Sequence, residues 1–207
     1  STRYATLFPY TTLFRSVFGD ATTDTVTGLG TLAVSGTTTI NTATVTSAGT
    51  QTYNGAVTLG ADTTLTTTDS TVLFSSTVDS TGGARDLTVS AGTGAITFTG
   101  AVGGTAALDA LALNSTGTTT LTAAVTAGSL ATNAGGTTAI NGGAVTTTGA
   151  QTYNDNVTLG ANTALSATTT TFNGTVAGGG FNLGLTGNAV FGDATTDTVT
   201  GLGTLAV

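Results

Sequence analysis

Apart from four tyrosines, the side chains available for acid–base or metal chemistry are ten aspartates and three arginines, because histidine, cysteine, glutamate and lysine are absent. Asp20 and Asp24 in FGDATTDT recur as Asp193 and Asp197, and carboxylates are hard oxygen ligands of the kind that Ca²⁺ prefers. Their spacing matches neither the EF-hand loop nor the glycine-rich nonapeptide of calcium-binding β-rolls. We therefore interpret them as turn-forming residues and predict no metal site.

The sequence also lacks the groups that a β-helix enzyme needs. A lyase of the pectate type needs a base and cations that hold an acidic sugar, but the only cation after residue 16 is Arg85, next to Asp86 in GGARDL. We interpret Arg85 as a solvated loop charge. Glycoside hydrolysis needs two carboxylates at a defined separation, whereas these aspartates are scattered through turn-like segments. We predict no catalytic residue and no enzyme, and keep a carbohydrate-active β-helix as a minor alternative.

Two glycine-rich segments, GAVGGTAA and VAGGGFN, resemble phosphate-binding loops only in composition. Neither is followed by lysine or placed between a strand and a helix, as a phosphate loop requires. We interpret both as turns, and predict that the chain binds no cofactor.

Runs of threonine suggest another function. A regular outward Thr-x-Thr array on a solenoid is how some ice-binding proteins present themselves, although threonine is also simply a soluble strand former. Irregular steps between the repeats of this chain argue against a flat array, so ice binding is an alternative function here. The runs are 37–39, 66–68, 118–120, 146–148 and 168–171.

The composition favours many short strands. Only 6% of the 207 residues are charged, against about 25% in ordinary globular proteins. Threonine is roughly 28% of the chain, and threonine and valine favour strands. The formal charge of −7 repels phosphate backbones, so we expect no nucleic-acid partner. No segment approaches the roughly 18 apolar residues of a membrane span.

The strongest pattern is self-similarity. The segment Val17–Val34 recurs unchanged as Val190–Val207. A weaker repeat aligns Thr37–Thr66 with Thr137–Ser166, with 18 of 30 positions identical. We therefore divide the chain after position 16 into one full period, 17–189, and the start of the next, 190–207.

A finer unit lies beneath both repeats, in which a large apolar residue is followed four or five positions later by valine. The shortest steps between units lead from Ile40 to Tyr53 and from Ile140 to Tyr153. Most other steps are close to roughly 20 residues, the length of one coil of a parallel β-solenoid. The units start at Ile40, Tyr53, Phe74, Phe98, Leu121, Ile140, Tyr153 and Phe172.

This spacing decides the expected architecture. The predicted fold class is all-β, a parallel β-solenoid (right-handed β-helix) of nine or ten coils. Immunoglobulin-like sandwiches are the rival, but they need more large apolar residues in two facing sheets than this chain contains.

Residues 1–16 differ from everything that follows. They hold the only proline and two of the three arginines, but no glycine or aspartate. The segment TLFPYTTLFRS is also the in-frame translation of a common short-read sequencing adapter, without a mismatch. We therefore interpret residues 1–16 as a non-native head that is disordered or frayed, and residues 17–207 as the solenoid.

The segments QTYNGAVTLGADTTL, TFNGTV, TFTGAVGG and INGGAVTTTGAQTYN resemble the repeats of large bacterial surface adhesins, the filamentous-haemagglutinin-like and autotransporter β-solenoid proteins. The resemblance covers essentially residues 17–207. It implies an extracellular stalk on the bacterial outer-membrane surface that mediates attachment or aggregation. The implied partner is a ligand on a host cell, a glycan or matrix, and no binding residue is carried over.

Both ends of the chain fall within a repeat, so we expect the sequence to be a fragment without caps. Open strand edges pair readily with other chains. We therefore expect end-to-end self-association.

Overall fold

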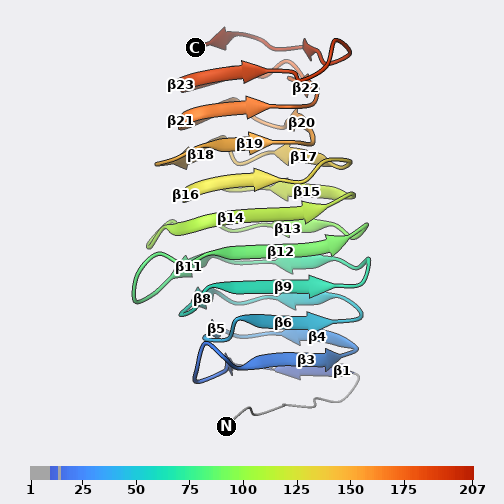
Figure 1. Ribbon diagram of the computed structural model, residues 1–207, viewed down its shortest axis with the longest axis vertical. Coiled ribbons are helices and arrows are strands. Elements are labelled where there is room, and N and C mark those ends of the chain that lie inside the picture. Colours follow the sequence, from blue (N-terminus) through green and yellow to red (C-terminus); the bar gives the residue numbers. More distant parts are fainter. Residues whose placement is uncertain (1–9, 14) are drawn as a thin grey trace.

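The computed structural model describes residues 10–13 and 15–207, and in them the chain winds into a stack of coils (Figure 1). Every strand pair in this part of the chain is parallel, and no helix occurs in it. The predicted all-β, parallel β-solenoid is confirmed. In Figure 1, front strands such as β9, β12 and β14 run from left to right, and the chain returns behind them while climbing toward the C-terminus. This winding is right-handed, as for other parallel strand crossovers.

Three sheets form the sides of the coil. One face is a ten-stranded sheet, whose strands are β1 (Tyr10–Leu13), β4 (Thr31–Val34), β7 (Gln51–Tyr53), β10 (Val72–Phe74), β13 (Ile96–Phe98), β15 (Thr118–Leu121), β17 (Thr137–Ile140), β20 (Asn156–Leu159), β22 (Val176–Ala177) and β24 (Val199–Thr200). A four-stranded sheet contains β2 (Ser16–Phe18), β5 (Thr38–Ile40), β8 (Val57–Leu59) and β11 (Val78–Ser80).

The third sheet has eleven strands. They are β3 (Thr25–Leu29), β6 (Thr44–Ser47), β9 (Thr63–Thr67), β12 (Leu87–Gly92), β14 (Leu108–Ser115), β16 (Val125–Thr132), β18 (Ala144–Thr147), β19 (Gln151–Tyr153), β21 (Thr163–Phe172), β23 (Leu183–Phe191) and β25 (Leu205–Ala206). The column of the four-stranded sheet continues through bridges at Val102 and Val125 into this sheet. From β16 onward, the side formed by the four-stranded sheet is therefore continuous with the eleven-stranded sheet.

The head predicted from the sequence falls partly outside the described residues, which omit 1–9 and 14. Its residues Tyr10–Leu13 form β1 and pair in parallel with β4. The interpretation of residues 1–16 as translated adapter stays a prediction.

Alternation along each strand builds the core. In β9, for example, residues 63, 65 and 67 are buried while 64 and 66 are partly exposed, as expected when side chains alternate between faces. The largest inward side chains form two stacks. Phe74 lies between Tyr53 and Phe98 with ring centroids 5.1 and 4.6 Å away, and Phe172 lies between Tyr153 and Phe191 at 5.2 and 5.3 Å.

The register of the ten-stranded sheet gives the true coil length. Val34, Tyr53, Phe74, Phe98 and Leu121 follow one another in a single column, so each step along this series is one coil. The predicted coil length of about 20 residues is confirmed.

The two shortest steps between sequence units are not short coils. Ile40 lies in the four-stranded sheet and Tyr53 in the ten-stranded sheet, while Ile140 lies in the ten-stranded sheet and Tyr153 in the eleven-stranded sheet. Each of these steps therefore leads from one face of the solenoid to another. Counting across faces therefore explains these two short steps, whereas the coil length within the ten-stranded sheet still varies.

Sequence repeats and coils are out of phase. The segment QTY lies in the ten-stranded sheet at 51–53 but in the eleven-stranded sheet at 151–153. Likewise, Val17 pairs within the four-stranded sheet, whereas its exact copy Val190 pairs within the eleven-stranded sheet. Each face requires only a short strand with alternating inward and outward residues, followed by a corner. The same sequence can therefore form a strand on different faces.

Candidate functional site

The repeated aspartate motif closes a turn in both copies. The Asp24 carboxylate accepts hydrogen bonds from the backbone N–H groups of Asp20 and Ala21 at 3.0 and 3.2 Å. Asp197 accepts the same pair from Asp193 and Ala194 at 3.0 and 2.9 Å. The hydrogen bond from the Asp20 N–H lowers the pKa of Asp24. The turn-forming role predicted for these residues is what the geometry shows.

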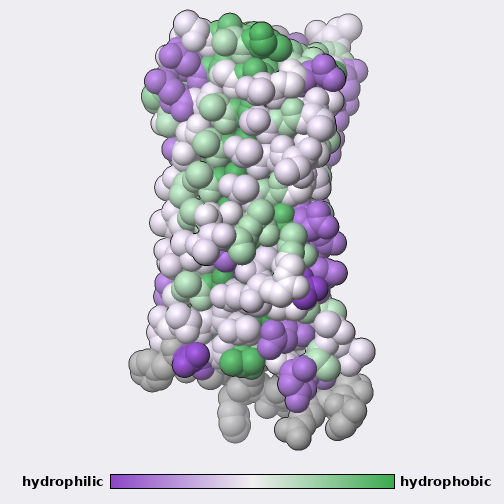
Figure 2. Space-filling view, turned by 90° about the vertical axis from the view of Figure 1, so that its left-hand side faces the viewer, coloured by the Kyte–Doolittle hydropathy of each residue, from purple (hydrophilic) through white to green (hydrophobic). Residues whose placement is uncertain are grey.

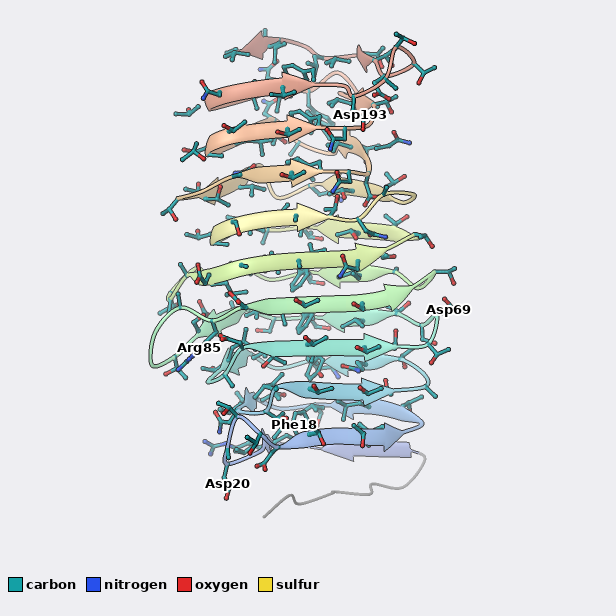
Figure 3. All side chains as sticks on the ribbon, in the orientation of Figure 1. Phe18, Asp20, Asp69, Arg85 and Asp193 are labelled. Atoms are coloured by element: carbon teal, nitrogen blue, oxygen red, sulfur yellow. The ribbon has the colours of Figure 1, made fainter. Side chains whose placement is uncertain are left out.

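The two copies of this turn project from different sides of the rod. Figure 3 places Asp20 at one lower edge and Asp193 near the opposite upper edge. Among residues 10–13 and 15–207, no group of three or more aspartate side chains lies close enough together to hold a metal ion.

Arg85 lies in the loop between β11 and β12. Its guanidinium donates hydrogen bonds to the carbonyl oxygens of Thr81 and Gly82, both at 3.4 Å, and its backbone N–H donates to the Ser80 hydroxyl at 3.1 Å. The side chain thus binds its own loop. The neighbouring Asp86 carboxylate accepts the N–H of Ala110 in the next coil at 2.9 Å.

Both glycine-rich segments connect strands, as predicted. GAVGGTAA runs from β13 to β14, and VAGGGFN runs from β22 to β23. Neither precedes a helix, so neither has the strand-to-helix setting of a phosphate loop.

The structure disperses the threonine runs over the three faces. Residues 37–39 lie at the four-stranded sheet, 118–120 at the ten-stranded sheet, and 66–68, 146–148 and 168–171 at the eleven-stranded sheet. Inward and outward residues alternate within 37–39, 66–68, 118–120 and 146–148, and Thr119 is fully buried. The runs therefore do not make one flat array.

An in-register array arises instead from threonines that the run pattern does not single out. Outward positions of the ten-stranded sheet form one in-register column, in which Thr97 pairs with Thr120. The column is Ala33, Thr52, Leu73, Thr97, Thr120, Ala139, Thr158, Ala177 and Thr200.

A second outward column lies two positions earlier on each strand. It includes Thr118 and Thr137, which pair directly. Where the position precedes the strand, its carbonyl oxygen accepts a bond from the previous coil, as Thr50 does from Leu32 at 2.9 Å. We call the two columns together the threonine face. The second column is Thr31, Thr50, Thr71, Ala95, Thr118, Thr137, Asn156, Thr175 and Thr198.

Twelve of the eighteen positions of the threonine face are threonine, and none is charged or aromatic. The other two faces differ in charge. Asp79 lies on an outward position of β11, and Asp109 is exposed on β14. Figure 2 views the side of the four-stranded sheet, where the surface is mostly white to green along the middle and hydrophilic residues lie mostly toward the edges.

Inside the rod, one polar pair recurs that sequence reasoning missed. The Gln51 amide donates to the carbonyl oxygens of Val45 and Thr66 at 3.2 and 3.0 Å and accepts the Tyr53 hydroxyl at 2.9 Å. Equivalent bonds recur around Gln151 and Tyr153, although that copy lies on another face. The repeated QTYN segment was the signal in the sequence. We call each pair a Gln–Tyr clamp.

Asp155 is another buried polar group that the sequence did not reveal. It is 1% exposed, and its carboxylate accepts the Gly136 N–H at 2.8 Å and the Thr138 hydroxyl at 3.2 Å. Burial raises the pKa of this carboxyl, and the two hydrogen bonds offset part of that effect. The aligned position in the first repeat is Gly55, where a Cβ would lie 2.2 Å from the Gly36 carbonyl oxygen.

Grooves on the surface of the described residues include two that lie along the eleven-stranded sheet. One lies between β3 and β6, near Gly28 and Ala48, and the other beside the loops at Ala84 and Ala107. Asp109 is the one acidic residue that lines either groove. Neither groove brings two carboxylates together.

No protein-family model, no curated protein and no solved structure matches this chain. No helix long and apolar enough to cross a membrane is found in the described residues. The fold and its surface are therefore the basis for any functional proposal.

Proposed function

We propose that this chain is a rod-like repeat segment of a large bacterial surface adhesin, where it holds a binding part away from the cell. The observation that supports this proposal is the uninterrupted stack of coils. Ten strands follow one another in the ten-stranded sheet, which at about 4.8 Å per strand corresponds to a rod of roughly 45 Å.

The interior suits a mechanical role. The aromatic stacks and the Gln–Tyr clamps link successive coils, and every described strand pair runs in parallel between neighbouring coils. Because each coil contacts mainly its neighbours, such a rod lengthens by adding coils without a new core. Attachment to a host cell, a glycan or matrix would then belong to another part of the parent protein.

The charged residues on the surface of the rod also support a structural role. Asp24 and Asp197 of the repeated turn accept backbone hydrogen bonds, and the one arginine after the head binds its own loop. These are the roles of residues that shape loops. An extracellular location on the bacterial outer-membrane surface belongs to the same proposal.

Long-read sequencing of the source DNA tests the function. We expect an open reading frame with the repeat unit 17–189 in tandem, joined to a secretion domain and an outer-membrane anchor. An intact reading frame that joins this segment to a catalytic domain, with no surface anchor, would overturn the adhesin proposal. The same reads also test the head, because residues 1–16 should be missing from the genomic sequence.

A further inference from the structure

We infer that the threonine face binds ice. This goes beyond the proposed rod and rests on a different observation, the two in-register outward columns of the ten-stranded sheet. The proposed site is the outward surface from β4 to β24. Its central strands, β13 and β15, contain Thr97, Thr118 and Thr120.

The spacing of the face is regular in two directions. Parallel pairing sets neighbours within a column about 4.8 Å apart, and positions i and i+2 on one strand lie about 6.6 Å apart. Water molecules on the prism faces of hexagonal ice repeat at similar intervals in two perpendicular directions. Nine successive strands keep the register over roughly 38 Å, so the array of side chains is long enough to contact many water molecules.

Threonine is suited to hold such a lattice. Its hydroxyl both donates and accepts hydrogen bonds, while its methyl group leaves adjacent water molecules bonded to one another. Because the side chain is branched at Cβ, its χ1 angle is restricted, and little freedom is lost on binding. The backbone beneath is held by in-register pairing such as Thr97 with Thr120 and Thr118 with Thr137.

The composition of the face selects against other ligands. Neither column contains a charged residue, so no ion disturbs the layer of water. Neither contains an aromatic residue, because Tyr53, Phe74 and Phe98 all point inward, and a flat sugar would therefore find no ring to stack on. The charge of −7 disfavours nucleic acid. An uncharged face with ranked hydroxyls and methyls fits an uncharged, ordered layer of water.

Thermal hysteresis and inhibition of ice recrystallisation by the full chain test the inference. The face variant is Thr97→Lys with Thr120→Lys, which replaces two paired residues at the centre of one column. The matched control is Thr64→Lys with Thr88→Lys. These two residues also pair with each other in register and are partly exposed, but they lie on the eleven-stranded sheet. Far-UV circular dichroism verifies that all three proteins have the same strand content.

We expect hysteresis from the natural sequence and the control, and activity at the level of buffer from the face variant. Absence of activity in the natural sequence, or equal loss in both variants, would overturn the inference. Sedimentation velocity gives a further arm. If the natural sequence dimerises and only the face variant is monomeric, the face binds a second copy of the chain and the ice inference is wrong. None of these results bears on the proposed rod function, which the long-read sequencing tests separately.

Discussion

Replacing Phe74 with alanine should destabilise the rod more than almost any other single change. The Phe74 ring is fully buried and lies nearly parallel to Tyr53 on one side and Phe98 on the other, with interplanar angles of 10° and 5°. Truncating a buried phenylalanine costs about 3–5 kcal/mol. Because two stacked pairs are lost together, each worth about 0.5–1.5 kcal/mol, we expect a cost near the top of that range.

Guanidinium unfolding followed by far-UV circular dichroism measures the loss. Because repeat rods can unfold in parts, hydrogen exchange should accompany it, with the loss of protection centred on β7, β10 and β13. Leu73→Ala is the control, since the Leu73 side chain points outward and is already partly exposed. We expect it to cost less than about 1 kcal/mol. Equal losses for Leu73→Ala and Phe74→Ala would refute the assigned inward and outward faces.

Three further predictions concern buried polar groups. Thr119→Val should stabilise the chain by about 1 kcal/mol in thermal or chemical unfolding, because the buried Thr119 hydroxyl has no hydrogen-bond partner; Thr120→Val on the outward face should have little effect. Gln51→Ala should cost about 3 kcal/mol in the same assays, because it removes two hydrogen bonds to carbonyl oxygens and the acceptor of the Tyr53 hydroxyl in the core. Burial raises the pKa of Asp155, so the folded state holds this proton more tightly than the unfolded state does. The contribution of Asp155 to stability is therefore greatest below its unfolded pKa of about 4 and is lost as the pH rises through the folded value. Asp155→Asn removes this loss, so its stability relative to the natural chain should rise between about pH 4 and pH 7; a constant difference would contradict this explanation.

The fold could be predicted from the sequence because each coil of a solenoid requires a similar pattern of buried residues at a similar spacing. The spacing of Tyr53, Phe74, Phe98 and Leu121 gives the coil directly, since all four lie in one column of the ten-stranded sheet. The assignment of strands to faces could not be predicted. Identical segments occupy different faces, so local sequence carries no information about which face a strand joins, and only the accumulated length of the loops decides it.

The threonine face was hidden for the same reason. Runs such as 118–120 attract attention, but alternation buries the middle residue of that run. The face consists instead of single threonines from different coils, and their alignment depends on the length of every coil between them. Asp155 was equally hidden, because its aligned counterpart Gly55 lies at a corner with no room for a side chain.

Distances between spin labels test the central claim, a continuous parallel stack of coils, most directly. The chain has no cysteine, so Thr52→Cys with Thr158→Cys gives two clean outward label sites in one column. Five coils separate them, and we predict about 24 Å between their Cα atoms, with a narrow distribution. The pair Thr52 and Thr152, equivalent in sequence but on different faces, should give a different distance. A broad distribution for Thr52 and Thr158, or a distance far above the predicted value, would contradict the solenoid.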